Sequence, residues 1–468
     1  MFSTSWLPFV LTISIFLLEA VQGAVLPPAD QSHGRQILGS LNLANYLSKR
    51  TKESEAPGMF RSQFSNPKEA LSVLLLIGGD VIQKAVAQMA GPASFTPVAF
   101  SFGWVAYSFN SLLNAIGSGA FLPEPDYPGS VIVVGSGDTR KNQAWVIGRL
   151  LRDLELEVES EFDKWEWLDE NTNQMVKTNP GDSGLLVTVY ETLPARQGYF
   201  LSGYAPKEPK KDALWWTYFP ITLTQLVIGA VPWIISGDWA VFFVTACGIV
   251  LALVTGSLRT LFLEKYACRH HSPQIYAIAR GNGHRHVFLI LPNSRDKDKS
   301  SALYLDDLAS AVQHGGWQTR AISIVLAALW VGFLVTVGGI DTNTWYLLGI
   351  GALGMAHNVF VAGWHRAPEA HGIPLQRAQG IKNEFGRRQK GAKNRPRVMD
   401  VLFDLEDAIP EAGFALRDLF FTGTLRPNEI EKWQSKQNDL KDRKTEWRKK
   451  RYPEESVKKQ PAPDHRKV

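Results

Sequence analysis

WWTYFPITLTQLVIGAVPWII (residues 215–235) is the stretch that decides the class of this protein. An apolar run of about 20 residues, at 1.5 Å per residue, is long enough to cross a hydrocarbon core of roughly 30 Å. Three further runs of this kind cover residues 239–263, 321–340 and 345–364. Because short links join the runs in pairs, they predict an α-helical multi-pass membrane bundle that contains two transmembrane hairpins, 213–263 and 321–364.

Basic residues are concentrated on one side of these runs. The links within the pairs, 236–238 and 341–344, contain no Lys or Arg. The outer flanks carry Lys207, Lys210, Lys211, Arg259, Lys265, Arg269, Arg320 and Arg366. By the positive-inside rule, both hairpins leave the cytoplasm and return to it. We therefore expect residues 123–212, 264–320 and 365–468 to be cytosolic, in a membrane of the secretory pathway (endoplasmic reticulum, plasma membrane or vacuole).

The N-terminal region begins with a short apolar core, residues 7–18, in front of Val21 and Gly23. This pattern predicts a signal peptide over residues 1–23, although no Lys or Arg precedes the core. The alternative is an uncleaved N-terminal anchor. A short polar segment, 24–69, follows in either case.

A further helical hairpin is predicted over residues 70–122. Its second half, 93–121, is rich in Phe, Tyr and Trp and favours a full span. Its first half, 70–90, carries Asp80 and Lys84 at mid-depth, where ionised groups are costly, which favours a re-entrant or interfacial segment over a full span. The charge rule then leaves two arrangements: seven spans with a retained anchor, or five with a cleaved signal and a re-entrant first half.

The soluble parts carry much of the mass, since the mean hydropathy of the 468 residues is only −0.10. In the loop 123–212, SVIVV (130–134) predicts a buried strand and residues 143–156 an amphipathic helix. Residues 155–168 alternate as a strand would, and 185–190 predict another strand.

The loop 264–320 predicts a β-hairpin, because residues 274–279 and 286–291 flank Gly281, Asn282 and Gly283. Neither loop alone has enough predicted strands and helices to form a hydrophobic core. We expect the two loops together to form one cytosolic α/β domain, with residues 130–134 and 286–291 in a single sheet. Two small independent caps are the alternative.

The tail, 365–468, has a different composition. Residues 377–397 hold eight Lys or Arg against Glu384 alone, which predicts an unstructured stretch or one lying on anionic lipid headgroups. Residues 398–421 predict short helices broken at Pro410, and residues 428–450 a charged helix. We therefore expect a basic, partly disordered cytosolic tail.

Polar residues at membrane depth form the first candidate binding site. Asp80 and Lys84 are four positions apart, so on a helix their charges would neutralise each other. Asn110 and Asn114 share a face of the next segment, and His357, beside Asn358, lies inside the last run. Such groups are either functional or contacts between helices.

A glycine-rich loop forms the second candidate site. Gly135 and Gly137 lie between a predicted strand and a predicted helix, where backbone N–H groups can bind an anion. Arg140 stands where a dinucleotide-binding loop has its third glycine, so the nucleotide fingerprint fails. Arg140 and Lys141 remain candidates for holding a phosphate or an anionic headgroup.

A histidine-rich segment offers ligands for a metal ion. Cys268, His270, His271, His284 and His286 supply five potential ligands. They complete no standard pattern, because no second Cys pair or acidic ligand accompanies them. We expect neither a metal nor a cofactor, and no motif indicates catalysis.

Three stretches carry a resemblance: LLLIGGDVIQKAVAQMAG, PVAFSFGWVAY and VIVVGSGDTRKNQAWVIGRLLRDLE. Here the chain resembles a group of filamentous-fungal multi-pass membrane proteins of unassigned activity, over about residues 70–365. The resemblance implies a fungal membrane protein encoded beside the genes of a biosynthetic (secondary metabolism) cluster. It implies no activity and no catalytic residue.

The sequence therefore favours an integral membrane protein without catalytic motifs, in an accessory, scaffold or partner- or lipid-binding role. Membrane lipids, with anionic headgroups at the tail, and a protein bound by the tail are the expected partners; nucleic acid is not. A small-molecule transporter or channel is the first alternative. A membrane-bound enzyme acting on a lipophilic metabolite, with His284, His286 or His357 as its acid–base groups, is the second.

Overall fold

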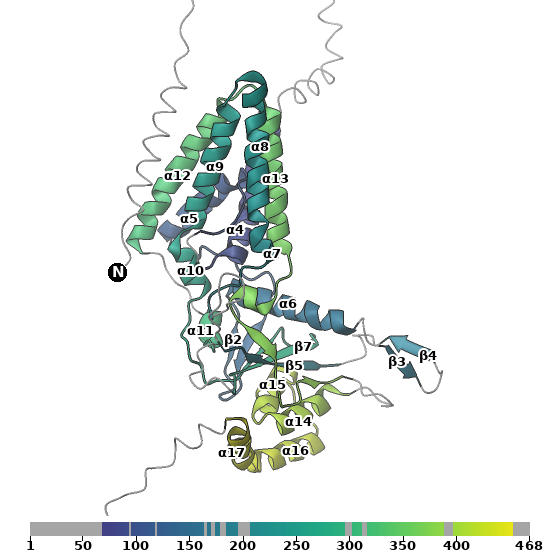
Figure 1. The fold of residues 1–468 in the computed structure, drawn as a ribbon. Coiled ribbons are helices and arrows are strands. Elements are labelled where there is room, and N and C mark those ends of the chain that lie inside the picture. The colour runs from purple at the N-terminus through teal and green to yellow at the C-terminus, as the bar shows by residue number, and fades with distance from the viewer. Residues whose placement is uncertain are drawn as a thin grey trace, which may run out of the picture. The chain divides into compact units, whose positions relative to one another are not determined.

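The structure is a computed structural model that describes residues 68–452 apart from short gaps (Figure 1). The gaps are 93–94, 118, 163–165, 170–173, 178–183, 195–205, 295–301, 311–315 and 388–395. The predicted signal peptide or anchor and the polar segment after it lie outside the described residues. Contacts divide the chain into two units. Unit 1 comprises Met1–Phe121, Ala213–Leu261 and His314–Trp364, and unit 2 comprises Leu122–Asp212, Phe262–Gln313 and His365–Val468.

Unit 1 is helical. Its elements are α4 (Lys68–Met89), α5 (Gly103–Gly117), α7 (Ala213–Trp216), α8 (Tyr218–Ser236), α9 (Ala240–Gly256), α12 (Trp317–Gly338) and α13 (Thr344–Gly363). Within the described residues, three helical stretches are long and apolar enough to cross a membrane: α7 with α8, α12 and α13. A fourth is counted if α9 and α10 (Arg259–Lys265), bent by 43° at their break, form one span. The five to seven spans expected from the sequence are thus not confirmed.

The helices of unit 1 form a closed ring. Each packs against the next in the order α9, α8, α13, α4, α5 and α12, and α12 packs on α9 again. At one end of the ring, which we call the turn end, the α8–α9 and α12–α13 turns meet through Asp238, which accepts hydrogen bonds from Thr342 and Asn343. The other end, where α8 begins and α9 and α13 end, is called the junction end.

An extended segment, residues 96–102, lies inside this ring. The ring of Phe100 packs edge-on against Phe333 of α12, and the Phe100 carbonyl is hydrogen-bonded by Gln225 of α8. Residues 96–102 are all buried and none of them is helical. The full span expected over residues 93–121 is therefore limited to a 15-residue helix, α5.

Two glycines of α13 make room for this segment. A Cβ atom on Gly354 would lie 1.8 Å from the Phe100 carbonyl oxygen, and one on Gly351 would lie 2.5 Å from the Phe102 ring. Real Cβ atoms do not approach other atoms so closely. The small residues of α13 thus admit an extended chain, and only glycine fits at these two positions.

Unit 2 is built around a mixed sheet. Its strands are β1 (Ser130–Val133), β2 (Thr139–Lys141), β5 (Leu186–Thr192), β6 (Tyr276–Ala279), β7 (His286–Leu291), β8 (Leu375–Arg377) and β9 (Glu384–Phe385). Six of the seven strands follow the order β2-β1-β6-β7-β5-β8, and the seventh, β9, pairs with β5. The β5–β7 pair is parallel and the other pairs are antiparallel. Strands 130–134 and 286–291 thus lie in one sheet, as the split-domain hypothesis requires. A separate hairpin joins β3 (Glu166–Asp169) to β4 (Gln174–Lys177).

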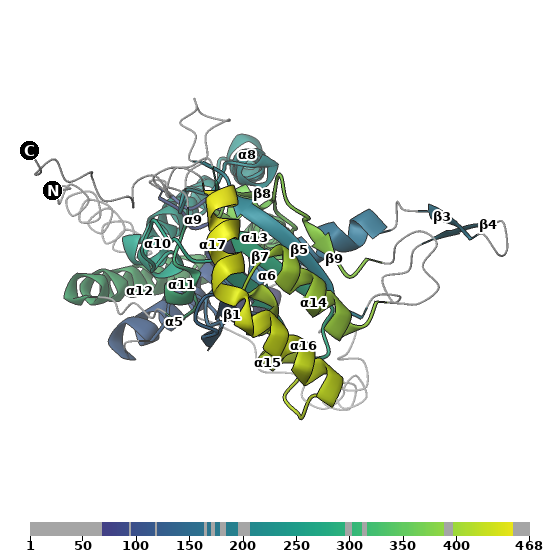
Figure 2. The same ribbon diagram turned by 90° about the horizontal axis from the view of Figure 1, so that it is seen from below.

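Both faces of the large sheet are covered, because alternate residues of each strand point to opposite faces. Val131, Ile278 and Phe288 face α6 (Trp145–Phe162) and α11 (Leu305–Ser310). Ile132, Ala277 and Leu289 face α14 (Val398–Ala408) and α15 (Ala412–Phe420). Figure 2 shows α14 and α15 in front of the strands. The domain therefore has three layers.

The tail is part of this domain, which corrects the expectation of a domain assembled from the two loops alone. Residues 388–395 and 453–468 of the predicted partly disordered tail lie outside the described residues. Residues 365–468 supply β8, β9 and the whole α14–α15 layer. The predicted charged helix is two helices, α16 (Pro427–Asn438) and α17 (Leu440–Arg451). The fully buried Glu406 accepts hydrogen bonds from the backbone N–H groups of Gly413 and Phe414 and pairs with Arg443 of α17. Glu406 and Arg443 thus link α14, α15 and α17.

The strand expected over residues 155–168 is also wrong for its first half. Residues 155–162 continue α6, because Leu151, Leu154 and Val158 maintain a helical spacing toward the sheet and are all buried. The alternation of polar and apolar residues here is the amphipathic face of the helix.

Substitution of Gly354 by alanine tests the ring and its enclosed segment. The added methyl group would overlap the Phe100 carbonyl oxygen, so overpacking should cost about 3 kcal/mol or more. Gly349→Ala, on the same helix, is the matched control, because no heavy atom lies within 4 Å of the Cβ position there. Thermal unfolding of the detergent-solubilised protein should show a large loss for Gly354→Ala alone. Equal behaviour of the two variants would contradict the placement of residues 96–102.

Candidate functional site

The polar membrane residues singled out from the sequence do not meet. Asp80 is exposed and Lys84 is half-buried, and no ion pair between them is found among the described residues. Asn110 is exposed on α5 and Asn114 is half-buried near its end. His357 is buried, and its Nε2 lies 2.9 Å from the Thr217 hydroxyl. These five residues therefore form no common site.

A different pair of amides gathers in the centre of unit 1. Asn358 of α13 accepts a hydrogen bond from the Ala99 N–H (3.0 Å) and donates one to the Ala99 carbonyl (2.9 Å). This two-bond pattern is the one that a neighbouring β-strand would provide. Because an unpaired backbone group in a lipid-surrounded core costs several kcal/mol, Asn358 makes an extended chain tolerable at this depth.

Gln225 of α8 performs the same task one residue further along. Its Nε2 donates to the carbonyl oxygens of Phe100 (2.7 Å) and Ile350 (3.0 Å). Its Oε1 has no hydrogen-bond partner among the described residues, and the same holds for the hydroxyl of Ser101. Both side chains are fully buried. We call Ser101, Gln225 and Asn358, with residues 96–102, the central polar site.

Sequence reasoning missed Gln225 and noted Asn358 only as a neighbour of His357. A usable signal was present, since Gln225 is an amide in the middle of the otherwise apolar run 215–235. Intramembrane polar residues are functional candidates by default. What the sequence could not reveal is that the partner of both amides is a non-helical backbone.

The glycine-rich loop of unit 2 does not have the geometry of an anion site. Gly135 and Gly137 lie in the turn between two antiparallel strands, β1 and β2, and not between a strand and a helix. Arg140 pairs with Asp138 at 3.1 Å and donates to the hydroxyl of Ser310. Lys141 is exposed on the edge strand. No helix N-terminus lies in this turn to concentrate N–H donors.

The histidine-rich segment likewise forms no metal site in the part of the chain that the structure describes. His270, His271 and His284 are exposed. His286 is buried at the start of β7, with Nε2 3.4 Å from a carboxylate oxygen of Glu159. Burial lowers the pKa of His286, against the attraction of Glu159, so the ring is neutral near pH 7.

A second carboxylate of α6, Glu155, contacts Tyr127 and lies near Arg280. The Tyr127 hydroxyl donates to Glu155 and accepts from Arg280, whose guanidinium also stacks on the Tyr127 ring. Burial and the Glu155 hydrogen bond raise the pKa of Tyr127 to about 12. Burial raises the pKa of Glu155 as well. This is a buried polar cluster in which Glu155 Oε1 and Arg280 Nε lack a hydrogen-bond partner among the described residues.

The most deeply buried ionic network of unit 2 centres on Asp153 of α6. One of its carboxylate oxygens lies 2.7 Å from His371 Nε2 and accepts a hydrogen bond from the Arg366 N–H at 3.0 Å. Arg366 in turn makes two hydrogen bonds to Asp212, at 2.7 and 3.0 Å. Burial lowers the pKa of His371 to about 4, so a neutral His371 donates its Nε2–H to ionised Asp153. The network fastens the chain segments that enter and leave α8 and α13.

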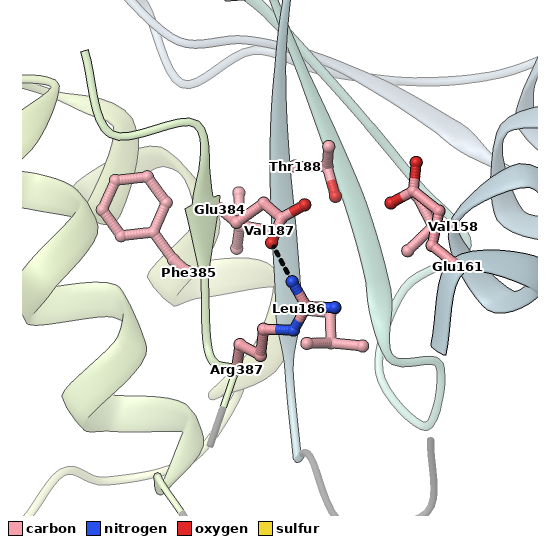
Figure 3. A pocket seen from close by; sticks show the side chains of 8 residues that line it. All are labelled: Val158, Glu161, Leu186, Val187, Thr188, Glu384, Phe385 and Arg387. Atoms are coloured by element: carbon pink, nitrogen blue, oxygen red, sulfur yellow. Dashed lines mark hydrogen bonds and ion pairs between the residues drawn. The ribbon is translucent and has the colours of Figure 1, made fainter. Parts of the chain in front are cut away.

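A pocket lies between α6, β5 and β9 (Figure 3). Its lining residues are Val158, Glu161, Leu186, Val187, Thr188, Glu384, Phe385 and Arg387. The carboxylate of Glu384 pairs with Arg387 at 2.8 Å across its rim. Its cavity volume of about 10 Å³ is room for one water molecule at most. The pocket therefore holds no substrate in this conformation.

Comparison with known proteins adds no family. No protein-family model, no curated protein and no solved structure matches the chain. The central polar site of unit 1 is thus judged on its geometry alone. Among the sites described, it alone combines a break in regular structure at membrane depth with unpartnered buried oxygens.

The pH dependence of unit 2 tests the Asp153–His371 pair. The pKa of His371 is lowered from 6.5 to about 4. Between these two pH values the His371 imidazole is therefore protonated in the unfolded chain and neutral in the folded protein. Stability should therefore fall as the pH drops from 6.5 to about 4, by about 3 kcal/mol in total. His371→Gln retains an N–H donor without titrating, so its unfolding midpoint should change less over this range. Identical pH profiles for the two proteins would refute this assignment.

Proposed function

We propose that the protein is a membrane transport protein for a small solute, in which residues 96–102 form a gate inside the helix ring. The observation that carries this proposal is the extended segment held by Asn358 and Gln225 in the centre of six helices. Non-helical backbone at membrane depth is tolerated where it is buried in protein or lines a cavity, and broken helices of this kind form the binding sites of many transporters.

The supporting argument compares this bundle with a simple anchor. Continuous helices satisfy their own backbone, so an anchoring bundle needs no buried amides and no glycine recesses. Here Gly351 and Gly354 admit the segment, and Asn358 and Gln225 replace the hydrogen bonds that a helix would have made. The unpartnered hydroxyl of Ser101 adds a hydrogen-bonding group beside the break. Such features are expected where a segment must be held and also released.

The proposal includes five spans, because α4 runs alongside α13 in the same direction. Gly78 lies against Met355 near the middle of both helices, and Gln88 donates to the Trp364 carbonyl where both end. The 22 residues of α4 are enough for a crossing. With α8, α9, α12 and α13 this makes five.

Residues 95–121 then form the re-entrant element in place of residues 70–90. Phe95 packs on Trp215 at the start of α8, and Thr96 donates to the Gly256 carbonyl at the end of α9. The chain thus enters at the junction end, turns into α5 at Gly103 beside Gly78, and reaches unit 2 at residue 122. Residues 95–121 therefore begin and end on the same side of the membrane.

The sheet of unit 2 supports a common side for its three segments. Strands β5, β7 and β8 come from different segments, and a membrane cannot separate hydrogen-bonded strands. The pieces of unit 1 between these segments, Ala213–Leu261 and His314–Trp364, must therefore each cross the membrane an even number of times. Because α8 crosses once in the first piece, α9 must cross back, which makes it the fourth span beside α8, α12 and α13. In this arrangement Lys68, at the start of α4, lies on the non-cytosolic side, against the positive-inside rule. The eight basic flanking residues on the cytosolic side outnumber it.

Glycosylation reporters test this arrangement. A reporter inserted near residue 45 should be glycosylated, because five spans and a cleaved signal place that segment opposite unit 2. Reporters inserted near residues 200 and 400 should remain unmodified. Modification at either of the latter points, or none at residue 45 in a protein that reaches the membrane, would reject the five-span arrangement.

Substituted-cysteine labelling tests the gate. In a background without Cys247 and Cys268, Ser101→Cys in reconstituted vesicles should react with a membrane-impermeant maleimide when residues 96–102 open. Asn358→Ala removes two hydrogen bonds from the segment, so it should speed this labelling about tenfold. The same variant should raise potassium chloride conductance in planar bilayers.

The matched control is Ala277→Cys, a fully buried position in strand β6 of unit 2, outside the helix ring. It should stay unlabelled in both backgrounds. If Ser101→Cys also stays unlabelled in folded protein carrying Asn358→Ala, residues 96–102 are fixed packing and the transport role is wrong.

A second role, docking of a partner or of anionic headgroups by unit 2, is favoured by one observation. The exposed surface of α17 carries Lys441, Arg448, Lys449 and Lys450, without ion-pair partners in the described residues. A basic surface of this kind suits phosphate-bearing lipid or an acidic protein segment. This role is that of an accessory membrane protein. It is the favoured function if Ser101→Cys is not labelled.

A further inference from the structure

The two helical hairpins of unit 1 are joined at the turn end by one carboxylate. Asp238, between α8 and α9, accepts hydrogen bonds from Asn343 Nδ2 (2.8 Å) and the Thr342 hydroxyl (3.1 Å), both between α12 and α13. Its other oxygen accepts from the Ala240 N–H at the start of α9. Hydrogen bonding by Asn343 lowers the pKa of Asp238, so the carboxylate is ionised near pH 7.

The helices on either side of this joint diverge. Although a short turn joins α12 to α13, α12 packs on α9 and α5, whereas α13 packs on α8 and α4 and makes only a small contact with α9. Residues 96–102 run between them from Thr96, beside Gly256 at the junction end, to Phe102, beside Gly351 near the middle of α13. At the turn end, the Asp238 joint is a direct polar contact between the two turns.

Buried apolar side chains lie within the first or last two turns of three ring helices at this end. Val241 and Val244 lie in the first turns of α9, Val337 at the end of α12 and Leu347 in the first turn of α13. All four are buried, and Val241 and Leu347 are fully so. We call these four residues the apolar collar. Apolar side chains gathered at one level of a bundle can close a pathway by excluding water.

Two features suit the joint to repeated opening. Asp238 is partly exposed to solvent, and hydrogen bonds at such a site contribute about 1 kcal/mol each, so they can break without unfolding the bundle. In addition, α12 ends at Gly338, followed by Gly339, and a Cβ on Gly338 would have open space around it. The chain next to the joint therefore has room to change direction.

We propose that the Asp238 joint and the apolar collar form a second gate, which closes the solute pathway at the turn end. This inference rests on the proposed transport function and deepens it: residues 96–102 close the pathway from the junction end, and the joint closes it from the other. Two gates in series can open in turn, so that a solute crosses without an open channel.

Labelling at the collar tests this gate without relying on solute flux. Val241→Cys, in the background without native cysteines, should react slowly with an impermeant maleimide supplied from the turn end. Asp238→Ala removes the joint, so it should speed the reaction about tenfold or more. Thr342→Ala removes one hydrogen bond, so it should give a smaller increase in a protein less prone to misfold. Ser236→Ala is the control, since its hydroxyl bonds only to Pro232 of its own helix.

The outcomes separate the two proposals. Faster Val241→Cys labelling in both joint variants, together with labelling of Ser101→Cys, supports the second gate. If Ser101→Cys is never labelled, the transport role fails, and faster Val241→Cys labelling then shows opening at the turn end without a solute pathway, which overturns the second gate. Unchanged labelling in folded Thr342→Ala and Asp238→Ala protein overturns the second gate, whatever the result at Ser101.

Discussion

Backbone groups that leave a helix inside a membrane bundle must find hydrogen bonds within the protein, and residues 96–102 place this constraint at the centre of unit 1. Asn358 and Gln225 satisfy it from two different helices. Their positions fix the depth of the segment, and Gly351 and Gly354 provide its space. The order of helices around the ring follows, because each must contact either the segment or a helix that holds it.

The same requirement for coverage explains unit 2. A sheet whose strands are apolar on both faces needs a helical layer on each. The first layer, α6 with α11, comes from the loops between membrane helices, and the second, α14 with α15, comes from the C-terminal segment. Since strands from three segments share hydrogen bonds, the sheet is complete only when the residues before, between and after the two helical hairpins are all present. The buried network of Asp153, His371 and Arg366 lies within this domain and joins α6 to the start of the C-terminal segment.

The candidate sites show where sequence reasoning reaches its limit. Asp80 and Lys84 stand out as ionised residues in an apolar run, yet Asp80 is exposed and the two form no pair among the described residues. Gly135 and Gly137 suggest an anion site by spacing alone, and an antiparallel partner strand turns their loop into a hairpin. Gln225 has an inconspicuous side chain, and its importance comes from a carbonyl oxygen 125 residues away.

The sequence by itself determined the membrane class, the long apolar helices and the α/β patterning of the soluble loops, because hydrophobic length and periodicity are local properties of the chain. It also determined the hairpin at residues 281–283, since the flanking strands are adjacent. Only the tertiary structure decided that residues 96–102 are extended and that the tail completes the domain. Both outcomes depend on hydrogen bonds and apolar contacts between residues far apart in sequence, and such pairings leave no periodic signal in a single chain.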